Sequence, residues 1–271
     1  MQQALQSEGS ATRWGALFGM RARDWAETWE GPQGYGTPLY KHVLDQAKIG
    51  PGSRVLDCGC GAGRFAHMAT GRGASVAGID AAESLIAIAA ERTPSGDFRV
   101  GDLEALPWHD QPFNVVTGFN AFQFADDKAR ALAEARRVSR GLVAVVIPTR
   151  ASESGLTSVY KPLLPLFAPE ALESMKQTGI FALSEQGKLD QTLAATDLTP
   201  VEDSEMELSI VFDDSDTAER AFMGTGPTQL AIRNSGEPTV AQAVRDALAP
   251  FIGKGGRVTL PGWYRAVLAR A

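Results

Sequence analysis

The sequence predicts an α/β fold built on a mostly parallel, seven-stranded sheet with helices packed against it. Five short apolar runs between residues 54 and 147 alternate with stretches of helical period, which is the pattern of repeated strand–helix–strand units. Two more extended runs follow, at 201–212 and 264–268. The chain has 271 residues, 44% hydrophobic and 21% charged, which is enough for one domain with a packed core.

Helices are expected before the first strand. In 14–30 the large apolar residues recur at helical spacing, and this run ends at Pro32. A second helix is expected to start at Pro38 and to stop at Gly50. Residues 1–13 are small and polar, so a frayed terminus is expected there.

The alternating region supplies most of the sheet. Its strands are expected at 54–57, 75–79, 98–100, 114–119 and 142–147, and its helices at 64–70, 84–92 and 128–138. Because crossovers between parallel strands are right-handed, the loops that follow the strands gather at one edge of the sheet. That edge is where a ligand site is expected.

After Pro148 the alternation becomes weaker. A helix is expected at 185–195, a strand at 201–212, an irregular stretch from 213 to about 238, a helix at 240–248 and a strand at 264–268. We treat the whole chain, 1–271, as a single domain with these parts: N-terminal lid helices 1–49, core 50–150, lid insertions 151–184 and 213–240, and C-terminal core 185–212 and 241–271.

The charge and composition of the chain limit the classes of partner that are expected. There are 26 basic against 32 acidic residues, a net charge of −6, and the basic residues form no block, so nucleic acid is not expected as a partner. No leader pattern opens the chain, and no apolar run approaches the roughly 20 residues of a membrane span. We therefore expect a cytoplasmic protein without a membrane partner. The oligomeric state is not indicated.

The two cysteines point to neither a disulfide nor a metal. Cys58 and Cys60 are separated by one glycine, which makes a bridge between them implausible. The three histidines, His42, His67 and His109, are scattered along the chain, so no metal site is predicted. Both cysteines are interpreted as small residues that line a tight turn.

The most distinctive feature is an apolar strand that leads through a glycine-rich turn into a helix, at Val55-Leu56-Asp57-Cys58-Gly59-Cys60-Gly61-Ala62-Gly63-Arg64-Phe65. Glycines let the backbone turn sharply and let a ligand approach, and the helix start offers free N–H groups to a carboxylate. A dinucleotide is disfavoured, because Arg64 stands where a glycine is needed and Asp57 would repel pyrophosphate. The acid instead suits a ligand with an ammonium group, such as the methionine end of S-adenosylmethionine.

This run resembles the first motif of the class I S-adenosylmethionine-dependent methyltransferases. Three later segments resemble the same family in order and spacing: Val76-Ala77-Gly78-Ile79-Asp80, Gly101-Asp102-Leu103-Glu104-Ala105-Leu106-Pro107 and Phe113-Asn114-Val115-Val116-Thr117-Gly118-Phe119-Asn120. The likeness covers about residues 50 to 150 and is greatest to small-molecule and quinone methyltransferases. It implies a Rossmann-like, doubly wound sheet and an enzyme that converts S-adenosylmethionine to S-adenosylhomocysteine.

The resemblance also implies which residues contact the cofactor: Asp57, Gly59, Gly61 and Gly63 at the methionine end, Asp80 and Ala81 at the ribose, Asp102 and Leu103 at the adenine, Phe119 and Asn120 beneath the methionine, and Trp25 as a cover. Simpler interpretations remain open. Asp57 could cap the following helix, Asp80 and Asp102 could be turn residues, and Trp25 could be a packing residue. Both a structural role and a binding role remain open for Asn120.

The acceptor is expected to be a small, partly apolar molecule held by lid residues and by the aromatic side chains Phe119, Phe122 and Phe124. The catalytic residues stay unassigned, because no pattern selects among Tyr35, Tyr40, His42, Glu30 and Tyr160. A non-catalytic protein that binds S-adenosylmethionine on the same fold is the alternative. A nucleic-acid methyltransferase is disfavoured, since Asn-Ala-Phe-Gln at 120–123 is not the Asn/Asp-Pro-Pro-aromatic motif of base methylation.

Overall fold

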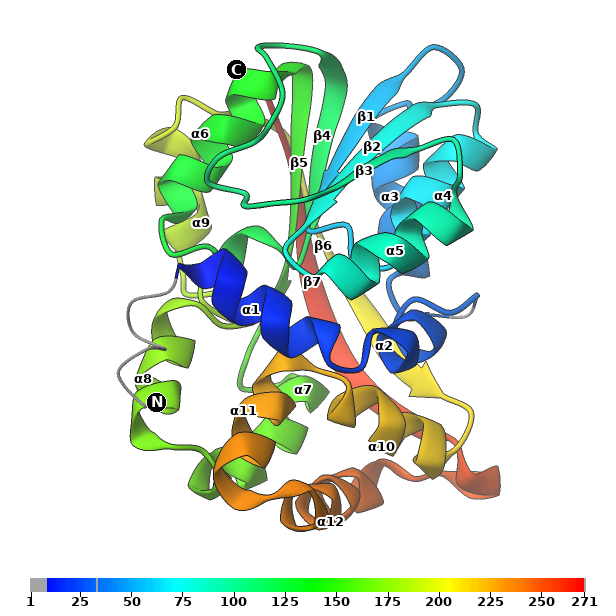
Figure 1. Cartoon of the computed structure of the whole chain (residues 1–271), viewed down its shortest axis with the longest axis vertical. Coiled ribbons are helices and arrows are strands. Elements are labelled where there is room, and N and C mark those ends of the chain that lie inside the picture. Colours follow the sequence, from blue (N-terminus) through cyan, green and yellow to red (C-terminus); the bar gives the residue numbers. More distant parts are fainter. Residues whose placement is uncertain (1–8, 33, 271) are drawn as a thin grey trace.

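Seven strands form one sheet in the order β3-β2-β1-β4-β5-β7-β6 (Figure 1). The computed structural model describes residues 9–32 and 34–270. The strands are β1 (Arg54–Cys58), β2 (Ser75–Asp80), β3 (Asp97–Val100), β4 (Phe113–Phe119), β5 (Ser139–Thr149), β6 (Thr199–Phe212) and β7 (Val258–Arg270). The first five are parallel, and β7 runs antiparallel between β5 and β6. The predicted mostly parallel sheet of seven strands is confirmed.

Helices cover both faces of the sheet, so the fold is doubly wound (Figure 1). On one face lie α3 (Thr37–Gln46), α4 (Arg64–Gly71) and α5 (Glu83–Arg92), and on the other lie α6 (Lys128–Val138) and α9 (Lys188–Ala194). Their apolar sides bury Leu, Val and Ala side chains against the strands, which removes apolar surface from water on both faces.

A second group of helices lies beyond the carboxyl ends of the parallel strands (Figure 1). These helices, which we call the lid, are α1 (Ser10–Gly19), α2 (Ala22–Thr28), α7 (Gly155–Tyr160), α8 (Pro169–Gln177), α10 (Ser215–Met223), α11 (Gly226–Ser235) and α12 (Glu237–Leu248). Short 3-10 turns complete the chain at η2 (Phe122–Phe124), η3 (Lys161–Leu166), η4 (Ala249–Phe251) and η5 (Lys254–Gly256). The lid has its own buried core, in which Trp14, Trp29 and Phe222 take part. This core is separate from the two cores that line the faces of the sheet.

Several expected boundaries are corrected. The single helix expected over 14–30 is two helices, because Arg21 adopts φ −130° and ψ 46°, which are not helical values. The expectation of a frayed terminus is wrong for 10–13, which are helical, while 1–8 lie outside the described residues. The stretch from 213 to 238 is not irregular, since α10 and α11 lie entirely within it. A cap at Asp214, whose side chain accepts from the Thr217 N–H, starts α10.

Residues 241–271 were expected to belong to the core of the sheet, but they are divided between the lid and the sheet. Helix α12 packs its buried side, with Val240, Val244 and Leu248, into the lid core. Only β7 from this part joins the sheet, and its outer half, from Val258, pairs with β6 alone. Strands β6 and β7 form a long antiparallel pair, and the three lid helices α10, α11 and α12 lie between them in the sequence. This pair therefore connects the sheet to those helices.

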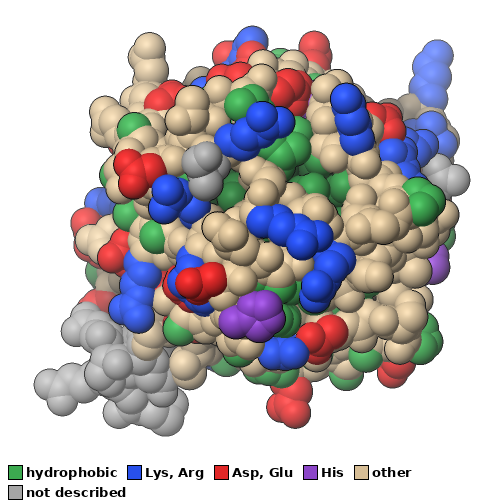
Figure 2. All heavy atoms as spheres, turned by 90° about the horizontal axis from the view of Figure 1, so that it is seen from above, with side chains coloured by type: hydrophobic (Ala, Val, Ile, Leu, Met, Phe, Trp, Pro, Cys, Tyr) green, Lys and Arg blue, Asp and Glu red, His purple; other side chains and the backbone are tan. Residues whose placement is uncertain are grey.

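The end of the molecule opposite the lid carries Lys and Arg side chains interspersed with Asp and Glu (Figure 2). Within 9–32 and 34–270, no helix has the length and apolar character needed to cross a membrane.

Candidate functional site

One large pocket lies at the carboxyl ends of β1, β2 and β4, beneath the lid. Its empty volume is about 1360 Å³, a figure that includes the part of the mouth that is open to solvent. The predicted residues that line it are Trp25, Asp57, Gly59, Gly61, Asp80, Ala81, Asp102, Leu103, Phe119 and Asn120. Segments distant in sequence thus meet at the edge where the parallel strands end.

Gly63 is the exception among the predicted residues. It has φ +80° and starts α4, and a Cβ there would lie 2.8 Å from the Cβ of Ala89 in α5. This position therefore needs glycine so that α4 and α5 can approach each other, and Gly63 does not line the pocket.

Glu30 fills the helix start that was expected to be open to a ligand. One carboxylate oxygen, Oε1, accepts from Trp25 Nε1 at 2.6 Å and from the Ala62 N–H at 2.9 Å. The other, Oε2, accepts from the Arg64 N–H at 3.0 Å and pairs with Arg92 at 3.2 Å. The expectation that these N–H groups bind a ligand carboxylate is wrong for this arrangement, because a side chain of the protein already occupies them.

Gly61 makes this contact possible. Its φ is +54°, and a Cβ at this position would lie 2.1 Å from Oε1 of Glu30. Close approach by the protein's own carboxylate is therefore one physical reason for the glycine, in addition to any approach by a ligand. Burial raises the pKa of Glu30, while its hydrogen bonds and Arg92 act in the opposite direction.

Asp80 connects the end of β2 to the glycine loop. Its Oδ2 accepts from the Gly61 N–H at 2.9 Å, and its Oδ1 accepts from the Ala82 N–H at 2.9 Å. The carboxylate thus fixes two loops of the pocket wall while it lines the pocket. Burial raises the pKa of Asp80, and these backbone hydrogen bonds partly offset the rise.

Asp57 lies deeper, at the end of β1. It accepts a hydrogen bond from Thr117 Oγ1 at 2.7 Å, and burial raises its pKa to about 8. The N–H groups of Ala62 and Arg64 at the start of α4 bond to Glu30 instead, so the interpretation of Asp57 as a cap for that helix is not supported. Its carboxyl lines the pocket and has spare hydrogen-bonding capacity.

Asp102 and Leu103 form the wall after β3. Asp102 Oδ1 accepts from the Glu104 N–H at 2.9 Å, which is the geometry of a turn. The turn interpretation therefore holds for this residue, and both side chains also line the pocket.

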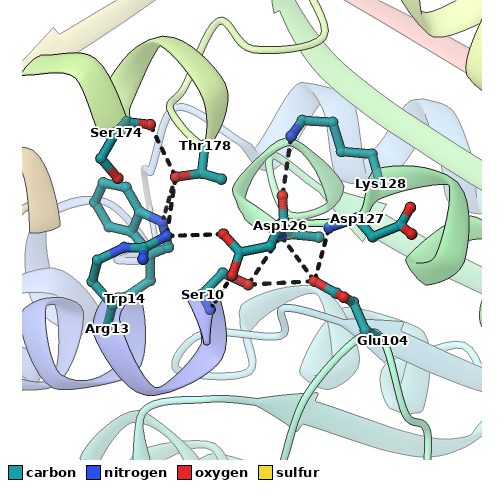
Figure 3. Close-up of polar contacts among 10 residues, drawn as sticks. Ser10, Arg13, Trp14, Glu104, Asp126, Asp127, Lys128, Ser174 and Thr178 are labelled. Atoms are coloured by element: carbon teal, nitrogen blue, oxygen red, sulfur yellow. Dashed lines mark hydrogen bonds and ion pairs between the residues drawn. The ribbon is translucent and has the colours of Figure 1, made fainter. Parts of the chain in front are cut away.

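Helix α1 crosses the pocket and is fixed at its first turn by a polar cluster (Figure 3). Asp126 accepts from the Ser10 N–H at 2.7 Å and pairs with Arg13 at 3.0 Å. Trp14 Nε1 donates to Thr178 Oγ1 at 3.4 Å. Ser10 and Trp14 line the pocket. Sequence reasoning missed Ser10 because it treated 1–13 as a frayed end, and it placed Trp14 on a helix without assigning it to the pocket.

Trp25 lines the pocket wall, held by its hydrogen bond to Glu30 and by edge contact with Phe18, at 5.3 Å between ring centroids. Two arginines near Trp25 in the sequence are engaged elsewhere, since Arg21 pairs with Glu237 and Arg23 with Glu91. Trp25 therefore has both a packing contact and a face on the pocket.

The lid end of the pocket is mainly apolar. Phe124 contacts Trp14 edge-on, with ring centroids 5.0 Å apart, and both line the pocket. Phe119 lines it too, but packs against Tyr40 and Phe65. The expectation that Phe122 holds an acceptor is wrong, because it is 1% exposed and lies in the sheet core. The lid residues missed by sequence reasoning are Trp14, Phe18, Trp29, Leu156, Ile180, Thr225 and Pro227.

None of the five candidate bases is placed and poised to take a proton from an acceptor near neutral pH. Burial raises the pKa of Tyr35 to about 12 and raises the pKa values of Tyr40 and Tyr160. His42 lies outside the pocket lining, against Ser204, at 2.8 Å. The Glu30 carboxylate is already engaged by four donors.

No group of three or more His, Cys, Asp or Glu side chains suited to a metal ion occurs in the described part of the chain. Cys58 and Cys60 are both free and buried.

Comparisons with known proteins agree with this geometry. A family model described as "Methyltransferase domain" matches residues 55–141. The chain is 30% identical over 220 residues to a malonyl-acyl-carrier-protein O-methyltransferase of Erwinia pyrifoliae, and the match covers 79% of this chain and 76% of that protein. It is 31% identical over 114 residues to the protein of the same name from Serratia marcescens, covering 42% of this chain but only 45% of that protein.

Among solved structures, the fold is similar to that of a geranyl diphosphate methyltransferase in complex with S-adenosylmethionine. The TM-score is 0.53 at 15% identity, and the match covers 86% of this chain and 84% of that one. At this identity the likeness bears on the fold alone.

Proposed function

The chain belongs to the class I S-adenosylmethionine-dependent methyltransferases, and from this we propose that it transfers a methyl group from S-adenosylmethionine to a small molecule held under the lid. The observation that carries the proposal is the pair of acids that line one pocket on either side of the glycine loop, the buried Asp57 and the half-buried Asp80. Support also comes from the lining of this pocket, which continues from the glycine loop into the lid.

The pocket residues fit this cofactor. Asp80 is suited to accept from the two ribose hydroxyls, Asp102 to accept from the adenine amino group, and Leu103 to pack on the ring. Asp57 faces the position proposed for the methionine ammonium. The acids of the pocket, Glu30, Asp57, Asp80 and Asp102, favour a ligand that carries ammonium and sulfonium charges.

When bound, the cofactor supplies an electrophilic methyl group on a sulfonium. The protein's own contribution is to align the acceptor with that group and to exclude water, which can supply roughly 7–11 kcal/mol of barrier reduction. The polar cluster at Ser10, Arg13 and Asp126 keeps α1 over the pocket and so shields part of it from solvent (Figure 3). The Erwinia relative is named after a malonyl acceptor, and we do not propose that acceptor for this chain.

Calorimetric titration with S-adenosylhomocysteine tests the proposal. One molecule is expected to bind, with release of a proton at pH 7, because Asp57 has a pKa of about 8 in the free protein and is then protonated. A ligand ammonium favours the ionised carboxylate, so the affinity is expected to fall as the pH is lowered from 8 to 6, by up to about 10-fold per unit.

Proton release is measured from the difference in observed enthalpy between phosphate and Tris buffers. Asp57→Asn is the matched control, and it is expected to bind more weakly without releasing a proton. Absence of binding by folded protein that carries no retained ligand would contradict the proposed function. Binding with equal enthalpies in both buffers would contradict the role proposed for Asp57.

A further inference from the structure

The charge of the pocket restricts the acceptor. Among the described residues that line it, four are Asp or Glu and none is Lys, Arg or His. Three arginines that neighbour lining residues are each paired with an acid: Arg13 with Asp126, Arg21 with Glu237 and Arg92 with Glu30. Burial of a carboxylate or a diphosphate without a cation costs several kcal/mol. An anionic acceptor therefore does not fit.

The lid end of the pocket offers apolar contacts instead. Its lining includes Trp14, Trp29, Phe124, Leu156, Ile180 and Pro227. The polar hydroxyls there are satisfied within the protein, since Tyr160 donates to Thr225 Oγ1 at 2.8 Å. The body of the acceptor is thus expected to be held by apolar and aromatic surface.

One side-chain polar atom of the described lining residues is fully buried and has no hydrogen-bond partner. Asn120 Nδ2 donates to Tyr35 Oη at 2.8 Å, and its backbone N–H donates to the Val146 carbonyl, but its Oδ1 is buried and accepts no hydrogen bond. A buried acceptor left in this state costs about 1–3 kcal/mol. Asn120 also has φ +52°, a strained conformation of the kind that is concentrated at ligand sites.

We propose that the acceptor is an uncharged, largely apolar molecule whose reacting hydroxyl or amine donates a hydrogen bond to Oδ1 of Asn120. This inference rests on the proposed function and adds the chemical class of the acceptor. Tyr35 holds the Asn120 amide in place as a positioning residue, while Asn120 determines specificity by contact with the nucleophile.

Three naphthalene probes test the proposal by calorimetric titration of protein saturated with S-adenosylhomocysteine. The probes 2-naphthol, 2-methoxynaphthalene and 2-naphthoate share a ring system and differ in hydrogen-bond donor and charge. 2-Naphthol is expected to bind about 10-fold more tightly than 2-methoxynaphthalene, as one buried hydrogen bond predicts. 2-Naphthoate is expected to bind most weakly. Asn120→Ala is expected to abolish the difference between the two neutral probes and to leave the affinity for 2-methoxynaphthalene unchanged.

A second variant tests whether the lack of a cation in the pocket is what weakens the binding of an anionic probe. Ile180→Lys places a cation at the lid end, where Ile180 is half-buried, and is expected to raise the affinity for 2-naphthoate at least about 10-fold without raising that for 2-naphthol. The proposal is overturned if 2-naphthoate binds the unmodified protein as tightly as 2-naphthol, if Asn120→Ala weakens all three probes equally, or if none of them binds. Failure to bind S-adenosylhomocysteine would instead count against the proposed function.

Discussion

Replacing Glu30 with alanine is expected to lower the free energy of unfolding by about 3–5 kcal/mol, the cost of removing one partner from a buried charged network. Glu30 is 5% exposed and accepts from Trp25, Ala62, Arg64 and Arg92. Without it, two backbone N–H groups and an indole N–H remain buried and unpaired, which is where most of the loss arises. Urea denaturation followed by tryptophan fluorescence measures the change.

Two further variants separate the stability lost with this hydrogen-bond network from the stability that any substitution near this position would lose. Glu30→Gln keeps one acceptor oxygen but turns an NH₂ group toward two donors, so its loss is expected to be smaller than that of alanine. Glu27→Ala lies close by in the sequence but removes only an exposed pair with Arg220, and it is expected to cost no more than about 1 kcal/mol. If Glu30→Ala loses less stability than about 1 kcal/mol, the Glu30 carboxylate does not hold the glycine loop in place.

Replacing Asp80 with alanine is expected to weaken the binding of S-adenosylhomocysteine by at least about 100-fold. Two ribose hydroxyl hydrogen bonds to a carboxylate contribute roughly 1.5–3 kcal/mol each, and the loss of both accounts for this factor. The variant also frees the N–H groups of Gly61 and Ala82, which loosens the two loops that form the wall. Calorimetric titration at constant pH measures the affinity.

Asp97→Ala provides the matched control, because Asp97 starts β3 at the opposite edge of the sheet and pairs there with Arg99. It is expected to leave the affinity unchanged. Asp80→Asn keeps the size of the side chain but lowers its acceptor strength, and an intermediate affinity is expected. An Asp80→Ala protein that is folded and binds as tightly as the parent would show that the ribose is held elsewhere.

The core of the fold was predictable because its signals are local. Strands β1 to β5 alternate with helices at short intervals except between β3 and β4, so apolar runs and helical periods in the sequence place them within a few residues. The same locality placed Asp57, Asp80 and Asp102 at one edge of the sheet, since each lies at or just after the carboxyl end of a parallel strand.

The lid was less predictable. Gly224, Gly226, Pro227 and Gly236 lie at or near helix ends, and they make 213–238 resemble an irregular stretch although two helices occupy it. A Pro in the first turn of α11 is in fact a helix-start signal, and it could have revealed that helix.

The role of Glu30 had no local signal at all. Its carboxylate reaches backbone groups 32 and 34 residues away, and only the packing of α2 on the glycine loop brings them together. The same holds for Trp14 and Asn120, whose partners Thr178 and Tyr35 lie in distant segments. Side chains that act through long-range contacts therefore require the folded structure.

A crystal structure of the protein with S-adenosylhomocysteine is the most direct test of the central claim, which is that the pocket at the glycine loop binds the cofactor. We expect ligand density in that pocket, with the ribose hydroxyls on Asp80, the adenine against Leu103 and Glu30 still bonded to the N–H groups of Ala62 and Arg64. Density at another site, or a ligand carboxylate that replaces Glu30 at the start of α4, would contradict it.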